Sequence, residues 1–290
     1  MSSLNLPKIR VTSPTLAETM RGCFLRAGLS RATGSSELVL GNPRAWLGIA
    51  YHEVLEKFPA VDLAQETFDS AVERLWNAAI ARQKNRADAH SLDSRFGSPI
   101  TWPGYYVARA SVALRAQELF GGVASAVVPS PKQVLRPGVG NSIREREFKA
   151  CGGKLVGRPD IIRDNDVVDY KSGAIWEYDD ATQTDAVKAA YVRQLRIYGY
   201  LIKESLGWWP LRGILLPLAG AGVEIALAPS DCARDAVEAV ELLDAYNRKV
   251  QAGATLDEIA SPSPERCRWC PYKLLCPPFC VLSASLNDLI

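Results

Sequence analysis

The sequence predicts a single α/β domain that carries a helical insert. Apolar residues recur at helical spacing up to residue 120, whereas after residue 141 short apolar runs bounded by turn residues are typical of strands. A stretch rich in Gly, Pro and Ser, residues 121–141, separates the two patterns. A chain of 290 residues is long for one average domain but suits one α/β core with an insertion.

Helices dominate the prediction for the first part of the chain. The predicted helices there are 13–27, 43–58, 62–88 and 105–120. Ser13 or Thr15 is a suitable N-cap for the first helix, and Pro59 ends the second. The last two helices form the predicted insert, residues 60–140, and the N-terminal helices occupy 13–58.

The predicted core lies at residues 141–250 of the single domain, 1–290. Its predicted strands are 143–149, 154–162, 167–171 and 213–217, and its predicted helices are 184–203 and 231–249. Strands followed by a helix, a strand and a helix indicate an α/β or an α+β core. A cysteine-rich segment, residues 262–281, follows the core.

Composition limits the class of protein but does not indicate a binding partner. The chain is 48% hydrophobic and 23% charged, and no apolar run approaches the roughly 18 residues of a membrane span. The N-terminus lacks the apolar centre of a secretory signal, so we expect a cytoplasmic protein with reduced thiols. A net charge of +2 carries no bulk signal for nucleic acid. Because a GxxxxGK[ST] phosphate loop is absent from the sequence, any helicase activity requires a separate chain.

The segment GRPDIIRDNDVVDYKSG, residues 157–173, predicts a β-hairpin, because a polar break separates two apolar runs. If Ile162 pairs with Val167, Asp160 lies directly opposite Asp169. The Cβ atoms of such a pair are roughly 5 Å apart on one face of the sheet.

Lys171 is predicted to share this face, because side chains alternate along a strand. Like charges placed opposite each other are destabilising, so the two carboxylates require a cation. Hard oxygen ligands suit Mg²⁺ or Mn²⁺, which activates water and neutralises charge on a phosphate. The lysine can then hold the attacking water or stabilise a pentavalent phosphate. The alternative is an exposed strand pair in which Lys171 closes a surface salt bridge.

These motifs resemble the active site of the PD-(D/E)XK nuclease superfamily, and specifically its RecB-like branch. The G-x-x-D of residues 157–160 and the D-Y-K-x-G of residues 169–173 match two strands of that branch. An upstream helical histidine and a later Q-x-x-x-Y motif also belong to it, and here they are matched by His52 and by Gln194 with Tyr198. The resemblance implies a restriction-endonuclease-like core, with a central mixed sheet flanked by helices.

The resemblance also implies the role of each residue. The expected metal ligands for Mg²⁺ or Mn²⁺ are His52, Asp160, Asp169 and the backbone carbonyl of Tyr170. The expected catalytic residues are Asp160, Asp169, Lys171, Gln194 and Tyr198. An imidazole ligand shifts the preference towards Mn²⁺. The alternatives are a packing or capping histidine at His52 and ordinary amphipathic polarity at the Q-x-x-x-Y motif.

Further residues match the site less specifically. Glu147 matches an acidic position on the first core strand of the family, and Glu145, on the same predicted face, is the alternative. Arg193 and Arg196 flank Gln194 and are predicted to lie near the site. The aromatic residues considered for stacking on unpaired bases are Trp102, Tyr105, Tyr106 and Trp269.

Cys267, Cys270 and Cys276 form a C-x2-C-x5-C array that can hold one metal centre with a fourth ligand from elsewhere. Cys23 before the core and three cysteines after it resemble the CRISPR-associated RecB-like exonucleases and the AddB nuclease domain. That resemblance implies a four-iron, four-sulfur cluster that ties the two ends of the chain together. The alternative is a zinc knuckle in which Cys280 replaces Cys23.

The function that the resemblance implies is a divalent-metal-dependent deoxyribonuclease. Our leading hypothesis is an exonuclease on single-stranded DNA ends, with 5′ to 3′ polarity, in DNA repair, CRISPR adaptation or phage defence. The first alternative is a nuclease subunit that is active only with a helicase or integrase partner. The second is a non-catalytic DNA-binding module with a zinc knuckle, against which the intact acidic pair argues.

Overall fold

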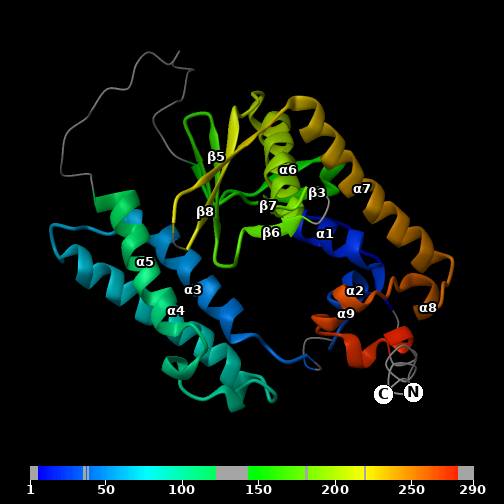
Figure 1. Ribbon diagram of the computed structural model, residues 1–290, viewed down its shortest axis with the longest axis horizontal. Helices are drawn as coiled ribbons and strands as arrows, with labels where there is room; N and C mark the ends of the chain where they lie inside the picture. The colour runs from blue at the N-terminus through cyan, green and yellow to red at the C-terminus, as the bar shows by residue number, and fades with distance from the viewer. Residues whose placement is uncertain are drawn as a thin grey trace.

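The computed structural model describes residues 6–34, 37, 39–121, 143–179, 182–218 and 220–279. Within these residues a five-stranded mixed sheet has the order β1-β4-β5-β8-β9 and lies between layers of helices (Figure 1). Its strands are β1 (Ile143–Arg144), β4 (Ile161–Arg163), β5 (Asp166–Lys171), β8 (Arg212–Pro217) and β9 (Val223–Ala226). Within this sheet only β5 and β8 run parallel, which confirms the predicted mixed sheet flanked by helices.

Two hydrophobic cores cover the two faces of the sheet. The helices on one face are α3 (Pro43–Lys57), α4 (Phe68–Ala89) and α5 (Tyr105–Phe120), and those on the other are α6 (Ala189–Leu206) and α7 (Pro229–Gln251). Val168 and Tyr170 pack against the first layer, whereas Val167 packs against the second. This alternation directs the side chains of Asp169 and Lys171 towards α6.

The remaining helices bring the two ends of the described chain together. They are α1 (Pro14–Gly22), α2 (Phe24–Leu29), α8 (Leu256–Ile259) and α9 (Pro264–Arg268). Short 3₁₀ helices occupy Phe58–Ala60, Ser94–Phe96, Pro99–Thr101, Cys151–Gly153 and Lys273–Leu275. Leu25 and Leu29 of α2 share a core cluster with Ile259 and Cys276, and Figure 1 shows α9 beside α2.

The predicted hairpin register is confirmed. Ile162 pairs with Val167 in the antiparallel ladder of β4 and β5. The turn between them includes Asp164 at a φ of +56°, a left-handed conformation that Asp adopts more readily than most residues. Ser13 is confirmed as the N-cap of α1, because its Oγ accepts a hydrogen bond from the Leu16 amide at 3.3 Å.

Two predicted strands are each divided in the structure. Segment 143–149 forms β1 and then β2 (Phe148–Ala150), and segment 154–162 forms β3 (Leu155–Gly157) and then β4. β2 and β3 pair with each other outside the main sheet. Glu145 has a φ of +46°, so the chain leaves the sheet there and side-chain alternation does not continue.

Two predicted helices also need correction. Segment 13–27 is interrupted at Cys23, which is extended (φ −166°, ψ 119°) and separates α1 from α2. Segment 184–203 begins as a strand, β7 (Thr184–Val187), which pairs with β6 (Trp176–Asp179) before α6 starts. Apolar spacing runs across both breaks, so the periodicity did not reveal them.

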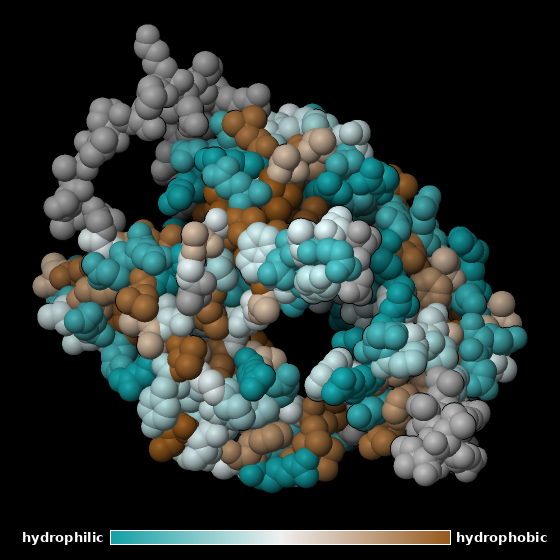
Figure 2. All heavy atoms as spheres, viewed as in Figure 1, coloured by the Kyte–Doolittle hydropathy of each residue, from teal (hydrophilic) through white to brown (hydrophobic). Residues whose placement is uncertain are grey.

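Part of the predicted organisation lies outside the described residues, namely 122–140 of the insert, 141–142 at the start of the core, and Cys280. Among the described helices, α4 and α5 pack against α3 in one core with the sheet. No described helix is both long enough and apolar enough to cross a membrane. Figure 2 shows an opening through the molecule, with α3 on one side and α1 and α2 on the other.

Candidate active site

A cavity of about 350 Å³, the active-site cavity, collects the residues that the acidic hairpin and the family motifs predicted. Its walls come from α1, α3, α6 and the end of β5. The predicted residues in its lining are His52, Asp160, Asp169, Tyr170, Lys171, Gln194 and Tyr198. Segments that are far apart in the sequence therefore meet at one site.

The two carboxylates are buried at the end of the hairpin. Asp160 and Asp169 are 8% and 3% exposed, and they lie one step beyond the last ladder pair of β4 and β5. The Tyr170 amide donates to Asp160 Oδ2 at 2.6 Å, which fixes this carboxylate against β5. Asp160 Oδ1 lies 3.4 Å from Nδ1 of His52, so the carboxylate presents one oxygen to the helix α3.

Lys171 is held by a network from α6. Its Nζ lies 2.5 Å from Asp169 Oδ2 and donates to Gln194 Oε1 at 2.6 Å. The Gln194 amide nitrogen donates to Asp169 Oδ1 at 3.3 Å and to the Tyr198 hydroxyl at 3.0 Å. The Lys171 ammonium also lies 4.5 Å from the ring centroid of Tyr191. Gln194 thus orients the lysine and the acid together, and Tyr198 orients Gln194.

The electrostatics of the cavity favour a bound cation. Burial, with a contribution from Asp160, raises the pKa of Asp169 to about 6 against the opposing charge of Lys171. Burial and Asp160 likewise raise the pKa of Glu145 to about 7. Burial opposes the charged form of His52, but the hydrogen bond to Asp160 and its charge raise the His52 pKa above the usual value. Carboxylates that resist ionisation in this way are stabilised by additional positive charge.

The donor atoms fit Mg²⁺ or Mn²⁺, although no three or more His, Cys, Asp or Glu side chains in the described ranges are arranged as a metal site. Neighbouring ligands of an octahedral ion with bonds of about 2.1 Å are roughly 3 Å apart. The 3.4 Å separation of His52 Nδ1 and Asp160 Oδ1 is close to this value. Carboxylate, carbonyl and imidazole donors are the types that these ions accept.

The structure corrects the prediction for Glu147. Its side chain is 57% exposed and lies 3.1 Å from Lys149, outside the active-site cavity. Glu145 is 17% exposed and lines an adjoining cavity with His52 and Asp160. The prediction assumed strand alternation through residue 145, and the positive φ of Glu145 removes it. Glu145, the alternative to Glu147, is therefore the residue that lies beside the acidic pair.

The two arginines have different positions. Arg193 donates to both carboxylate oxygens of Glu18 at 2.6 and 2.8 Å, and Glu18 lines the active-site cavity. Arg196 pairs with Asp231 of α7 at 2.9 Å, which fastens α6 to α7. Arg193 therefore reaches the rim of the site through Glu18, and Arg196 does not line the cavity.

Sequence reasoning missed Tyr191, whose ring lies beside the Lys171 ammonium. It precedes Gln194 by three positions on α6, so helical spacing offered a signal. The structure also buries Trp102 and Tyr105, at 3% and 7% exposure, which excludes stacking on bases by these two rings.

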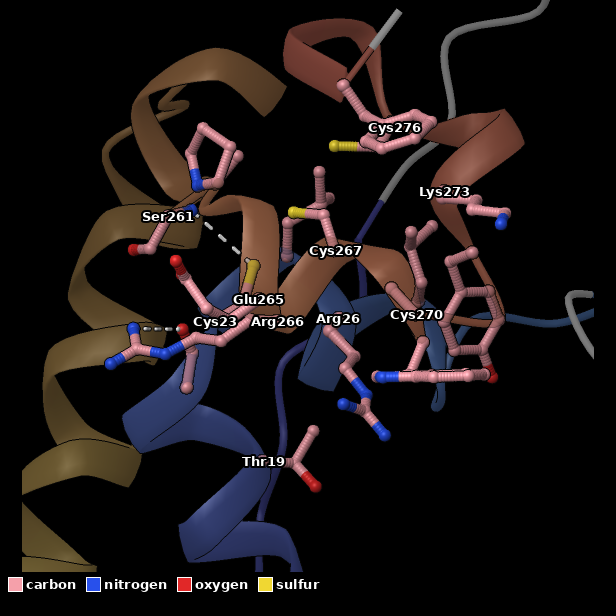
Figure 3. Close-up of a pocket in the computed structure, with 18 of the residues that line it drawn as sticks. Thr19, Cys23, Arg26, Ser261, Glu265, Arg266, Cys267, Cys270, Lys273 and Cys276 are labelled. Carbon is pink, nitrogen blue, oxygen red and sulfur yellow. Dashed lines mark hydrogen bonds between the residues drawn. The ribbon is translucent and has the colours of Figure 1, made fainter. Parts of the chain in front are cut away.

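A second cavity, the cysteine cavity, has a volume of about 260 Å³ and is lined by Cys23, Cys267, Cys270 and Cys276. Figure 3 shows the sulfur atoms of Cys23, Cys267 and Cys276 around the same space. The Ser261 amide donates to Cys23 Sγ at 3.4 Å. Burial raises the thiol pKa of Cys270 and of Cys276. Such thiols lose their protons when they bind a metal.

Comparison with known proteins identifies the family of the chain. No curated protein matches the sequence. A candidate exonuclease from Eubacterium rectale, known from a crystal structure, is 11% identical at a TM-score of 0.49, with 85% of this chain and 83% of that chain covered. The crystal structure of SSO0001 is 18% identical at a TM-score of 0.32, with 67% and 80% covered. The family model for the PD-(D/E)XK nuclease superfamily matches residues 11–277, and the chain belongs to this superfamily.

Proposed function

We propose that this nuclease is a divalent-metal-dependent exonuclease that hydrolyses single-stranded DNA from an end. The observation that carries the proposal is the buried pair of Asp160 and Asp169 with Lys171 and His52 in one cavity. A buried carboxylate pair costs folding free energy unless a cation compensates it. In metal-assisted phosphodiester hydrolysis the metal ion supplies this compensating charge.

Each side chain has a role that its contacts support. Asp160, Asp169, His52 and the Tyr170 carbonyl would hold Mg²⁺ or Mn²⁺, which supplies an activated water and neutralises charge on the phosphate. Lys171 has donors left to orient the attacking water or to stabilise the phosphate oxygens, because its ammonium carries three protons. Gln194 keeps the lysine in place through its contact at 2.6 Å.

The preference for a free single-stranded end is supported by the shape of the molecule. The opening in Figure 2 lies between α3 and α1, which contribute His52 and Glu18 to the active-site cavity. We propose that a strand passes between these helices and enters by its free end. A covalently closed circle has none.

A comparison of linear and circular substrates tests this proposal. We expect the protein with Mn²⁺ to degrade a linear single-stranded oligonucleotide and to leave a circular single strand of the same sequence intact. Labels at the 5′ or 3′ end report the polarity, for which we propose 5′ to 3′. Cleavage of the circle at a similar rate would contradict exonuclease action and indicate an endonuclease.

We further propose that the cysteine cavity holds a four-iron, four-sulfur cluster with a structural role. Cys23 and Cys267 are separated by more than two hundred residues of sequence, yet they line one cavity. Closing so long a loop restricts the unfolded chain and stabilises the fold by about 5 kcal/mol. Glu18 of α1 lines both cavities, so the cluster would also fix the helix that walls the active site.

The two glutamates near β1 provide a matched test of the site boundary. We expect Glu145→Gln to lower activity at limiting Mn²⁺ by about 10-fold or more, because residues that support metal ligands have effects of that size. Glu145 lies beside Asp160, and its amide donates to the Asp160 carbonyl at 3.1 Å. Glu147→Gln should have no effect, since Glu147 contacts Lys149. Equal effects of the two substitutions in a Mn²⁺ titration would contradict this assignment.

The pH dependence of cleavage follows from the raised pKa of Asp169. The carboxyl is protonated below its pKa of about 6, and metal ions bind only the ionised form. At limiting Mn²⁺ we expect the initial rate to rise about 10-fold between pH 5 and pH 7 and then to level off. Saturating Mn²⁺ should flatten the profile, since the metal displaces the proton. A limiting-metal profile without this rise would exclude Asp169 as the group responsible.

A further inference from the structure

The hairpin of β6 and β7, the aromatic hairpin, carries two exposed aromatic side chains. Trp176 is 47% exposed and Tyr178 is 57% exposed. They are two positions apart on β6 and therefore point to the same face, about 7 Å apart along the strand. The pairing of Trp176 with Val187 and of Tyr178 with Asp185 keeps this part of β6 regular.

The aromatic hairpin follows in the chain directly after residues that line the active-site cavity. Gly173 lines the cavity, and Trp176 follows it by three residues, a reach of at most about 10 Å. At the base of the hairpin the Lys188 amide donates to the Ile175 carbonyl at 3.0 Å, and Lys188 Nζ donates to the Ala174 carbonyl at 2.7 Å. These bonds attach the two aromatic residues firmly to the rim of the site.

The aromatic hairpin also lies near the proposed path of the strand. In the view of Figures 1 and 2 it lies at the edge of the opening between α3 and α1. Lys188 is within 5.7 Å of the ring centroid of Tyr191, which lines the active-site cavity, so positive charge continues from Lys171 to the hairpin base. Asp185 opposite Tyr178 disfavours a phosphate on the aromatic face, and bases rather than phosphates are then the suitable ligands there.

We propose that Trp176 and Tyr178 form a stacking subsite for unpaired bases of the DNA strand whose phosphate lies in the active-site cavity. This inference rests on the proposed nuclease function and adds to it the surface that selects single strands. Stacking on aromatic rings tolerates any base sequence, as an exonuclease requires. Paired bases inside a duplex cannot reach such a surface, because their faces are already stacked.

The other exposed aromatic residues have different surroundings. Trp269 lines the cysteine cavity, and the Arg268 guanidinium lies 5.0 Å from its ring centroid. Tyr106 is 65% exposed and lies in a groove between α4 and α5. Neither lines the active-site cavity, so Tyr106 is a suitable control for removal of an exposed aromatic ring.

Binding of a fluorescent oligo-dT, measured with metal chelated so that cleavage cannot occur, tests the subsite. The double variant Trp176→Ala with Tyr178→Ala should bind about 10-fold or more weakly, since each stacked base contributes a factor of this order. The double variant Trp176→Phe with Tyr178→Phe keeps both rings and should restore binding. Tyr106→Ala should bind as the unaltered protein does. Unchanged affinity of the double alanine variant would overturn the proposal.

A small phosphodiester separates failure of the subsite from failure of the proposed function. The p-nitrophenyl ester of thymidine 5′-monophosphate contains one base and tests the active-site cavity with Mn²⁺. The double alanine variant should hydrolyse it at the rate of the unaltered protein, which also shows that the variant is folded. A variant that loses this activity equally would overturn a separate subsite. Absence of hydrolysis and of oligonucleotide cleavage by the unaltered protein would instead overturn the nuclease function and the subsite with it.

Discussion

Asp169→Asn is expected to lower metal-dependent cleavage by at least about 1,000-fold, because it removes a charged ligand of the proposed metal, and such a ligand contributes several kcal/mol. The side chain is buried and in contact with both Lys171 and Gln194. Asn is nearly the same size, so packing should be preserved. Asp166→Asn on the same strand is the matched control, since Asp166 pairs with Arg212 away from the cavity, and its activity should be unaffected.

The same substitution should stabilise the metal-free protein. Because the pKa of Asp169 is raised to about 6, the carboxyl is mostly ionised at pH 8, and its charge costs roughly 3 kcal/mol. The attraction of Lys171 is already included in that pKa. We therefore expect a gain of up to about 3 kcal/mol at pH 8, which raises the Tm by several degrees. At pH 5 folded Asp169 is protonated whereas unfolded Asp169 is still ionised, so about half of the gain should remain, and it should vanish only below a pH of about 4.

Thermal unfolding at the two pH values with a chelator present measures this effect. A variant that is less stable at pH 8 and equally inactive would mean that Asp169 has a structural role. A variant that is more stable and inactive would mean that the acid is retained for chemistry at the expense of stability.

Cys23→Ser is expected to abolish iron binding and to destabilise the protein by several kcal/mol. The substitution removes the one proposed ligand that lies before the core, and with it the link to Cys267, Cys270 and Cys276. Because α1 ends at Cys23 and carries Glu18 on the wall of the active-site cavity, cleavage should fall as well. The measurements are iron content, visible absorption of anaerobically purified protein and thermal unfolding.

Cys151→Ser is the matched control for this experiment, because Cys151 does not line the cysteine cavity. It should retain iron and stability. Stoichiometric zinc in the unaltered protein, with Cys23→Ser harmless, would contradict the cluster and favour the local zinc knuckle.

The acidic hairpin shows how far sequence reasoning reaches. A polar turn between two apolar runs was sufficient to derive the pairing of Ile162 with Val167, and the position of Asp160 relative to Asp169 followed. Register depends on local turn chemistry and on alternation, which a sequence displays directly. The helix that carries His52 could be predicted from its spacing, but its approach to Asp160 depends on packing across the sheet. Only the family resemblance anticipated that contact.

Two of the errors arose where the backbone departs from its regular form without a Gly or Pro to mark the position. Glu145 takes a left-handed conformation, and its carboxylate, not that of Glu147, lies beside Asp160. Cys23 interrupts a helix whose apolar spacing continues on both sides. In both cases a tertiary contact, with Asp160 or within the cysteine cavity, accompanies the break. Such contacts join distant segments and cannot be read from local propensity.

The central claim is that Lys171 and the buried acids form a metal-dependent nuclease site. The most direct measurement incubates the unaltered protein and Lys171→Ala, both purified anaerobically, with end-labelled single-stranded DNA in Mn²⁺, Mg²⁺ or chelator. Lys149→Ala serves as the control for loss of a lysine outside the active-site cavity, since Lys149 contacts Glu147. We predict metal-dependent degradation by the unaltered protein and by Lys149→Ala, and none by Lys171→Ala. Cleavage by Lys171→Ala at the unaltered rate, or no cleavage by the unaltered protein with either metal, would contradict the account.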